Sequence, residues 1–230
     1  MSAYALEVIH VHFRYPETQQ PVLKNIHFTI KPGEIVGIVG LSGSGKTTLI
    51  NILNGVIPKR ISGDLGGQVL LWGKPVSSLE LTDISQSLGT IFQDPDNQIL
   101  FPNTEDELAF GPENLCREPS EIIESITDTL SLLGISHLRS KNPNQVSGGE
   151  KQLITVAAIL TLDASILIFD ESLSFIDKKG RQLVKEAIKK LKNQGKAILM
   201  VEHELDNLSL ADRIYLLKDG TLQNFEGVIE

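Results

Sequence analysis

The segment Gly40-Leu41-Ser42-Gly43-Ser44-Gly45-Lys46-Thr47 constrains the fold of this chain more than any other. It matches the pattern Gly-x-x-x-x-Gly-Lys-[Ser/Thr] and lies between an apolar run, 35–39, and a helix expected over 48–56. Glycines let successive backbone amides point inward, and the helix N-terminus adds positive potential, so such a turn binds phosphate. We expect the Lys46 ammonium to reach the β- and γ-phosphates and the Thr47 hydroxyl to ligate Mg²⁺.

The hydrophobic pattern of the remaining chain predicts an α/β fold. Continuous apolar runs at 166–169 and 197–201 are typical of strands buried on both faces, and an amphipathic stretch, 181–192, separates them. Strands that alternate with helices form a parallel sheet covered on both sides. Residues 4–30 alternate apolar and polar positions instead, which predicts short antiparallel strands.

The stretch from 94 to 144 has a helical, proline-punctuated composition. Thr104-Glu105-Asp106-Glu107 fits a capping box, in which the Thr104 hydroxyl and the Glu107 carboxylate would bind each other's backbone amides. A second helix is expected to begin at Pro119-Ser120-Glu121.

Composition excludes several classes of protein. The 230 residues carry 21 Lys and Arg against 29 Asp and Glu, a net charge of −8, so the cationic surface that duplex nucleic acid requires is missing and no nucleic-acid partner is expected. A single cysteine fits a reducing compartment rather than an oxidised secreted scaffold. No apolar run approaches the ~20 residues of a membrane span, so we expect membrane association to depend on a partner.

Two adjacent carboxylates, Asp170 and Glu171, end the apolar run 166–169. Neighbouring side chains of a strand face opposite ways, which favours different roles for the two. Asp170 is the better candidate to hold Mg²⁺ through water, and Glu171 is the better candidate to orient or deprotonate an attacking water. Without the upstream phosphate-binding turn, the pair would fit a solvated loop equally well.

A second turn, Ser147-Gly148-Gly149-Glu150, precedes another expected helix. Ser147 is a good N-cap and the two glycines expose free amides, so the turn could bind a second anion. The alternative is an ordinary helix cap.

With these motifs, the chain resembles ATP-binding-cassette (ABC) ATPases over nearly its whole length. Tyr15 matches the aromatic residue that stacks on adenine, Gln93 the glutamine loop, and His203 the switch histidine. Ser147-Gly148-Gly149-Glu150 is similar to the signature motif, and Ser174-Phe175-Ile176-Asp177 to the D-loop.

The resemblance implies one ABC ATPase domain over 1–230. Residues 1–93 and 147–230 would form a RecA-like P-loop core with an N-terminal antiparallel β subdomain, and 94–146 a small α-helical subdomain. Two such cassettes, copies or different chains, would face each other head to tail and enclose ATP between the P-loop of one and the signature turn of the other. The assignments that the resemblance implies are ATP binding by Tyr15, Gly40–Thr47, Thr48 and Gln93, Mg²⁺ binding by Thr47, Gln93 and Asp170, and catalysis by Lys46, Glu171 and His203.

A narrower resemblance follows Gln93. The segments 94–99 and 104–114 are similar to ATPase subunits of energy-coupling factor importers of vitamins or transition-metal ions. This implies a peripheral protein at the cytoplasmic face of the cell membrane, docked to an integral coupling protein and through it to a substrate-binding membrane subunit. Residues just after Gln93 are expected to form the docking surface.

The signature side departs from the family pattern. Glu150 replaces the commoner Gln, Leu153 stands where a basic residue is frequent, and Ser172-Leu173 replaces Pro-Thr. Three alternatives stay open at this stage: a conventional ABC importer or exporter subunit, a non-transport cassette in DNA repair or translation, and a nucleotide-gated interaction module with negligible turnover.

Overall fold

The computed structural model describes residues 3–174 and 176–225. Phe175 of the D-loop segment lies outside the described residues. The larger sheet has six strands within this part of the chain, in the order β10 (Thr221–Asn224), β9 (Arg213–Lys218), β3 (Ile35–Val39), β8 (Ala197–Glu202), β7 (Ile166–Asp170), β6 (Leu88–Ile91). Pairings from β9 to β6 are parallel and β10 is antiparallel, which confirms the predicted α/β class.

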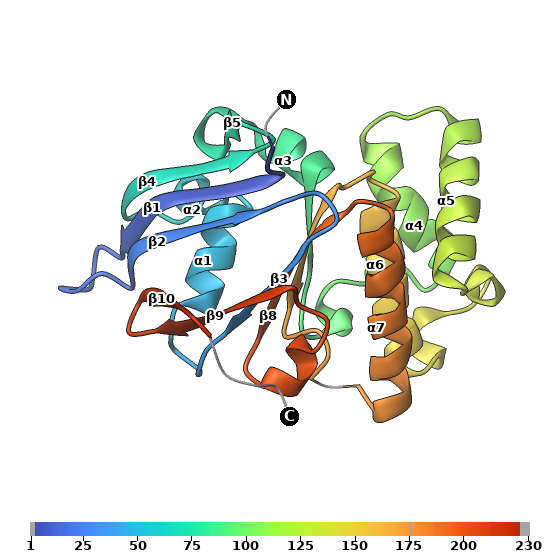
Figure 1. Ribbon diagram of the computed structural model, residues 1–230. Coiled ribbons are helices and arrows are strands. Elements are labelled where there is room, and N and C mark those ends of the chain that lie inside the picture. The colour runs from blue at the N-terminus through green and yellow to red at the C-terminus, as the bar shows by residue number, and fades with distance from the viewer. Residues whose placement is uncertain (1–2, 175, 226–230) are drawn as a thin grey trace.

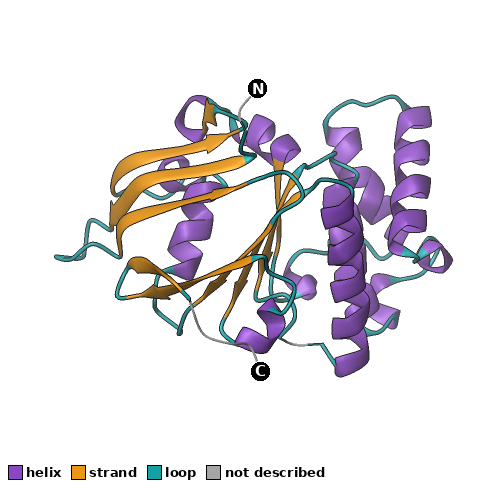
Figure 2. Ribbon diagram, in the orientation of Figure 1, coloured by secondary structure: helices purple, strands orange, loops and turns teal. Residues whose placement is uncertain are grey.

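A smaller antiparallel sheet covers one side of the molecule (Figures 1 and 2). Its described strands are β2 (Leu23–Ile30), β1 (Leu6–Arg14), β4 (Asp64–Leu71) and β5 (Lys74–Pro75), in that order. Helix α1 (Lys46–Leu53) lies between the two sheets, followed by α2 (Val56–Lys59) and α3 (Leu81–Ser87). The remaining helices lie beyond the opposite face of the larger sheet: α4 (Thr104–Asn114), α5 (Pro119–Leu133), α6 (Gly148–Leu160) and α7 (Lys178–Asn193).

Strand β3 divides the core into two layers, because its alternate side chains point to opposite faces. Val36 and Ile38 join the cluster that includes β1, β2 and α1, whereas Ile35 and Val39 join the cluster under α5, α6 and α7. The strand is therefore buried on both faces, as its continuous apolar sequence predicts, and its carboxyl end carries the glycine-rich turn between the layers.

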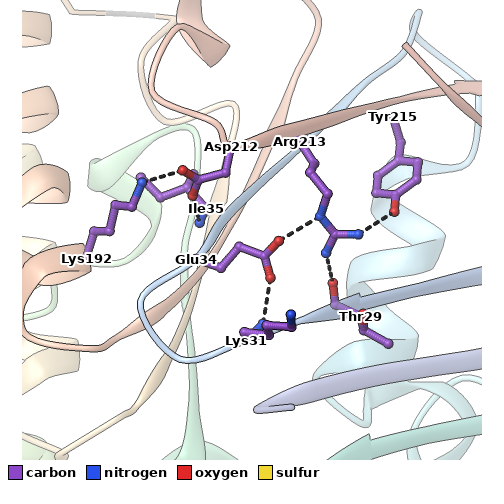
Figure 3. Close-up of polar contacts among 8 residues, drawn as sticks. All are labelled: Thr29, Lys31, Glu34, Ile35, Lys192, Asp212, Arg213 and Tyr215. Carbon is purple, nitrogen blue, oxygen red and sulfur yellow. Dashed lines mark hydrogen bonds and ion pairs between the residues drawn. The ribbon is translucent and has the colours of Figure 1, made fainter. Parts of the chain in front are cut away.

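A polar network at the opposite end of β3 joins the two sheets (Figure 3). Arg213 of β9 donates to the backbone oxygen of Thr29 in β2 and to the Glu34 carboxylate, both at 2.6 Å. Asp212 accepts from the Ile35 amide at 2.8 Å and from Lys192 of α7 at 2.5 Å. These contacts hold the antiparallel sheet, the parallel sheet and α7 together.

The start of α4 differs from the sequence prediction. Asn103, not Thr104, is the N-cap, and its side chain accepts from the Glu105 amide. Thr104 instead donates to the Lys141 backbone oxygen, and Glu107 binds the amides of Leu100 and Phe101. The predicted Thr104–Glu107 capping box was wrong because distant backbone groups satisfy both side chains. Helix α5 does begin at Pro119.

Candidate nucleotide site

A cavity of about 590 Å³ lies at the carboxyl ends of β3 and β7. The glycine-rich turn lines it together with three other regions that the sequence analysis selected. Its lining residues are Val22, Leu41, Ser42, Gly43, Gly45, Lys46, Thr47, Thr48, Gln93, Asp170, Glu171 and His203. Parallel strands end at one edge of their sheet, which is why groups more than 150 residues apart in sequence meet here.

Lys46 is held close to the turn. Its ammonium donates to the backbone oxygens of Gly40 at 2.7 Å and Leu41 at 3.1 Å, and lies 3.2 Å from Glu171 Oε1. The side chain is only 7% exposed, so its charge acts in a medium that screens it less than water does. Ser44 contributes a buried hydroxyl with no hydrogen-bond partner among the described residues.

The Glu171 carboxylate lies close to the side chains of three other predicted site residues. Besides Lys46, its carboxylate accepts from Gln93 Nε2 at 3.3 Å and lies 3.5 Å from His203 Nδ1. Its backbone has a φ of 48°, a left-handed conformation that costs a non-glycine residue ~1–2 kcal/mol. The bond from its amide to the Val201 oxygen, 2.8 Å long, holds the backbone at this point.

Asp170 has a different environment. Burial, together with the neighbouring Glu171 charge, raises the pKa of Asp170 to about 6, against the opposing effect of Lys46. Both carboxylates line the same cavity, because β7 ends at Asp170 and the left-handed backbone of Glu171 breaks the strand alternation that was expected to turn the two side chains in opposite directions.

A family model described as "ABC transporter" matches residues 23–174. The chain belongs to the ABC transporter family. It is 36% identical, over 212 residues, to the energy-coupling factor transporter ATP-binding protein EcfA1 of Mycoplasma pneumoniae, covering 92% of this chain and 75% of that protein. It is 38% identical over 214 residues to EcfA of Methanosarcina acetivorans, with 92% and 76% covered. These relatives confirm the predicted resemblance to energy-coupling factor ATPases.

A solved structure supports the same assignment. CbiO1 of Clostridium perfringens, described as part of the ABC transporter complex cbiONQ, superimposes with a TM-score of 0.87 at 28% identity, covering 96% of this chain and 88% of that one. The ABC ATPase fold predicted from the motifs is thereby confirmed.

Three residues predicted to bind ATP, namely Tyr15, Gly40 and Ser44, are not among the residues that line this cavity. The Tyr15 hydroxyl is 3.1 Å from Thr48 Oγ1, and its ring meets the Phe13 ring edge-on. Gly40 directly follows β3, and a side chain there would meet the Ser44 hydroxyl at 2.6 Å. Nothing in these positions contradicts the predicted roles, which stay predictions.

The ABC signature turn is not part of the lining. Ser147 caps α6 in a capping box: Ser147 Oγ accepts from the Glu150 amide at 3.3 Å, and Glu150 Oε2 accepts from the Ser147 amide at 3.0 Å. The bonds from Ser147, followed by the effect of His137, hold the pKa of Glu150 below its usual value. Asp177 of the D-loop is likewise a cap, accepting from the Gly180 amide at 2.8 Å at the start of α7. These assignments also stay predictions.

Glu202, which precedes His203, is not among the residues that the sequence predicted for the site. Its side chain is 0% exposed, and one carboxylate oxygen accepts from Asn207 Nδ2 at 3.1 Å while the other has no hydrogen-bond partner among the described residues. Burial raises the pKa of Glu202 to about 7, hydrogen bonding opposes this rise, and the nearby Glu171 and Asp170 carboxylates add to it. A charged residue that ends the apolar run 197–201 was the available signal.

The helices give no sign of a membrane crossing. Among the described residues, none combines the length and the apolar character that a span requires.

Proposed function

We propose that this ABC transporter ATPase binds and hydrolyses ATP to energise an importer of the energy-coupling factor type. The observation that carries the proposal is the convergence on Glu171, inside the P-loop cavity, of Lys46, Gln93 and His203 at 3.2 to 3.5 Å. Such a cluster of an ammonium, an amide, an imidazole and a carboxylate can position a triphosphate and a water together. The names of the relatives support the transport role.

The P-loop supplies the phosphate contacts. Its inward amides and the α1 N-terminus favour negative charge, and Lys46 is the nearest full positive charge. Glu171 now faces the Lys46 ammonium, so a bound γ-phosphate would compete with Glu171 for the same cation. Binding would thus release the carboxylate for its second role.

Glu171 is the candidate general base. A carboxylate within reach of the attacking water accepts its proton as the new P–O bond forms, while the bond to the β-phosphate oxygen breaks. His203, 3.5 Å from Glu171, and Gln93, 3.3 Å from it, are placed to orient that water and the γ-phosphate.

The oxygen donors present in the cavity fit a magnesium ion. Thr47 contributes a hydroxyl, Gln93 an amide oxygen and Asp170 a carboxylate, and Mg²⁺ prefers such ligands together with water and substrate phosphates. Burial, followed by the Glu171 charge, raises the pKa of Asp170, so a cation beside this carboxylate would stabilise its charged form. When bound, the ion would neutralise charge on the β- and γ-phosphates.

The position of the signature turn supports action as a dimer. Ser147, Gly148, Gly149 and Glu150 begin α6, a helix of 13 residues whose N-terminus favours anions, yet none lines the cavity of this chain. We infer that the turn serves ATP bound to a second ABC subunit, a copy or a different cassette, and that Asp177 contributes at the same interface.

A membrane partner is proposed to dock on the helical side. An apolar groove of about 220 Å³ runs between α3 and α6, with Phe92 at its edge. Phe92, Leu100 and Phe110 are 43%, 67% and 41% exposed, and Phe92 is among the residues that line the groove. Large exposed apolar side chains next to an apolar groove are typical of an interaction surface. We assign this surface to the integral coupling protein, which would hold the ATPase at the cytoplasmic face and link it to a substrate-binding membrane subunit.

The subdomain division predicted from the sequence fits this assignment. The stretch 94–146 contains α4 and α5, and the core elements come from 1–93 and 147–230.

The proposal is tested by Glu171→Gln. We expect ATP binding to persist, hydrolysis to fall by on the order of 10²-fold or more, and an ATP-dependent dimer to accumulate. Single-turnover hydrolysis and size-exclusion chromatography with ATP measure the two effects. Glu204→Gln, which changes an exposed carboxylate 3.6 Å from His203, is the matched control and should keep most of the activity. Unchanged turnover in Glu171→Gln would remove Glu171 from the base role.

A further inference from the structure

The segment 94–101, which follows Gln93, is anchored to the core sheet through Gln98. Gln98 donates from Nε2 to the Thr90 oxygen of β6 at 3.0 Å and accepts at Oε1 from the Phe92 amide at 3.2 Å. Asp94 Oδ1 accepts from the Asp96 amide at 3.0 Å and caps a short 3₁₀ turn. The segment therefore has a defined shape rather than that of a free loop.

The end of the segment is anchored to the helical subdomain. The Glu107 carboxylate of α4, which is 7% exposed, accepts from the amides of Leu100 and Phe101 at 2.8 Å each. The Phe101 ring contacts the Phe110 ring of α4 at a centroid distance of 5.3 Å. If a partner moved the exposed Leu100 side chain, the whole segment would therefore move with it.

The middle of the segment contacts the signature helix. Lys151 follows Glu150 directly, in the first turn of α6, and its ammonium lies 2.5 Å from Asp96 Oδ1. The same ammonium donates to Asn144 Oδ1 at 3.3 Å. The Lys151 side chain is 14% exposed and the Asp96 side chain 63% exposed, so the ammonium is partly shielded from solvent while the carboxylate is not.

This ion pair is the only one that joins the segment to α6 within residues 3–174 and 176–225. One neutral contact accompanies it, from Gln152 Nε2 to the Phe92 oxygen at 3.1 Å. The segment thus follows directly on Gln93, which contacts Glu171, carries the exposed Leu100, and contacts Lys151, the residue after the signature turn.

We propose that the Asp96–Lys151 ion pair is a coupling contact, which transmits movement between the membrane-partner surface and the signature turn. The inference deepens the proposed function and rests on it. Neither residue lines the nucleotide cavity, so the pair acts by positioning α6 relative to the segment 94–101 and not by contact with ATP. Coupling of this kind requires a packed element that can take two discrete positions. A direct charge contact between α6 and the segment would favour one of these positions over the other.

The test compares the isolated full-length chain with the membrane complex that copurifies with it. We expect Asp96→Asn and Lys151→Gln each to lower ATP hydrolysis by the complex at least fivefold. In the isolated chain carrying Glu171→Gln, the same changes should leave ATP affinity and ATP-driven dimerisation within twofold. Reversal of the pair, Asp96→Lys with Lys151→Asp, should restore at least half of the lost activity.

Lys192→Gln is the matched control. It removes another 2.5 Å Lys–Asp ion pair, Lys192–Asp212, which joins α7 to the region before β9 (Figure 3). We expect the complex with this change to hydrolyse ATP at the wild-type rate, which separates coupling from the general effect of losing an ion pair.

The outcomes are separable. If Glu171→Gln leaves ATP hydrolysis by the complex unchanged, the proposed function itself fails. If Glu171→Gln abolishes hydrolysis but Asp96→Asn leaves the complex fully active, or lowers the ATP affinity of the isolated chain more than twofold, the coupling role alone is overturned. Failure of the reversed pair to restore activity, with both variants folded by circular dichroism, overturns it as well.

Discussion

The buried carboxyl of Glu202 makes folding stability depend on pH. Its pKa rises from the usual 4.5 to about 7 in the folded chain, chiefly through burial. Between these two pH values the native protein holds a proton that the unfolded chain has released. Stability must therefore fall as pH rises from about 4.5 to about 7 and stay level above that. A pKa difference of one corresponds to ~1.4 kcal/mol, so the full loss is about 3 kcal/mol.

Glu202→Gln keeps the size of the side chain and cannot ionise. Relative to the wild type, this variant should gain about 3 kcal/mol of unfolding free energy between pH 5 and pH 8. The two proteins should differ least at pH 5, because the loss of wild-type stability has only begun there: the folded carboxyl is protonated and the unfolded one has just started to ionise.

Urea unfolding of the full-length chain at several pH values measures this difference. Nucleotide and Mg²⁺ must be omitted, since each would stabilise the native state by its own binding. Glu204 is an exposed carboxylate two residues away, and the Glu204→Gln variant should keep the wild-type dependence of stability on pH. Equal pH slopes for Glu202→Gln and the wild type would refute the assignment of a buried, protonated Glu202.

Three further predictions concern the cavity itself. Lys46→Ala should weaken both nucleotide binding and turnover, and a titration with a fluorescent ATP analogue that shows normal affinity would contradict the phosphate-binding role. His203→Ala should lose most hydrolysis while ATP binding stays near normal; a steady-state assay that retains most of the activity would count against the switch role. Gly45 has a φ of 106°, and a methyl group there would meet the Leu23 side chain at 2.9 Å. Gly45→Ala should therefore reduce ATP affinity at least tenfold and lower the melting temperature, and unaltered values of both would show that the turn tolerates a side chain.

The sequence was most informative where function depends on consecutive residues. The glycine-rich turn 40–47 is expected to follow a buried strand, and the continuous apolar run 35–39 predicts that strand independently. A strand buried on both faces must be apolar throughout. The cap of α6 by Ser147 and Glu150 is equally local, and the structure has it as a capping box. Asp170 and Glu171 were placed at a strand end by the same reasoning.

Local patterns were misleading where distant groups compete for the same side chain. Thr104 and Glu107 have the spacing of a capping box. The Thr104 hydroxyl binds the Lys141 oxygen instead, and the Glu107 carboxylate binds the Leu100 and Phe101 amides. A spacing pattern contains no information about those competitors.

The amino-acid sequence by itself determined the phosphate-binding turn, the parallel sheet and the identity of the residues available for catalysis, since each depends on neighbours along the chain. Only the tertiary structure decided that Glu171 meets Lys46 and His203, that Asp96 pairs with Lys151, and that Glu202 is sealed from water. Distances, burial and pKa values arise from packing between segments far apart in the chain, and no run of consecutive residues encodes them.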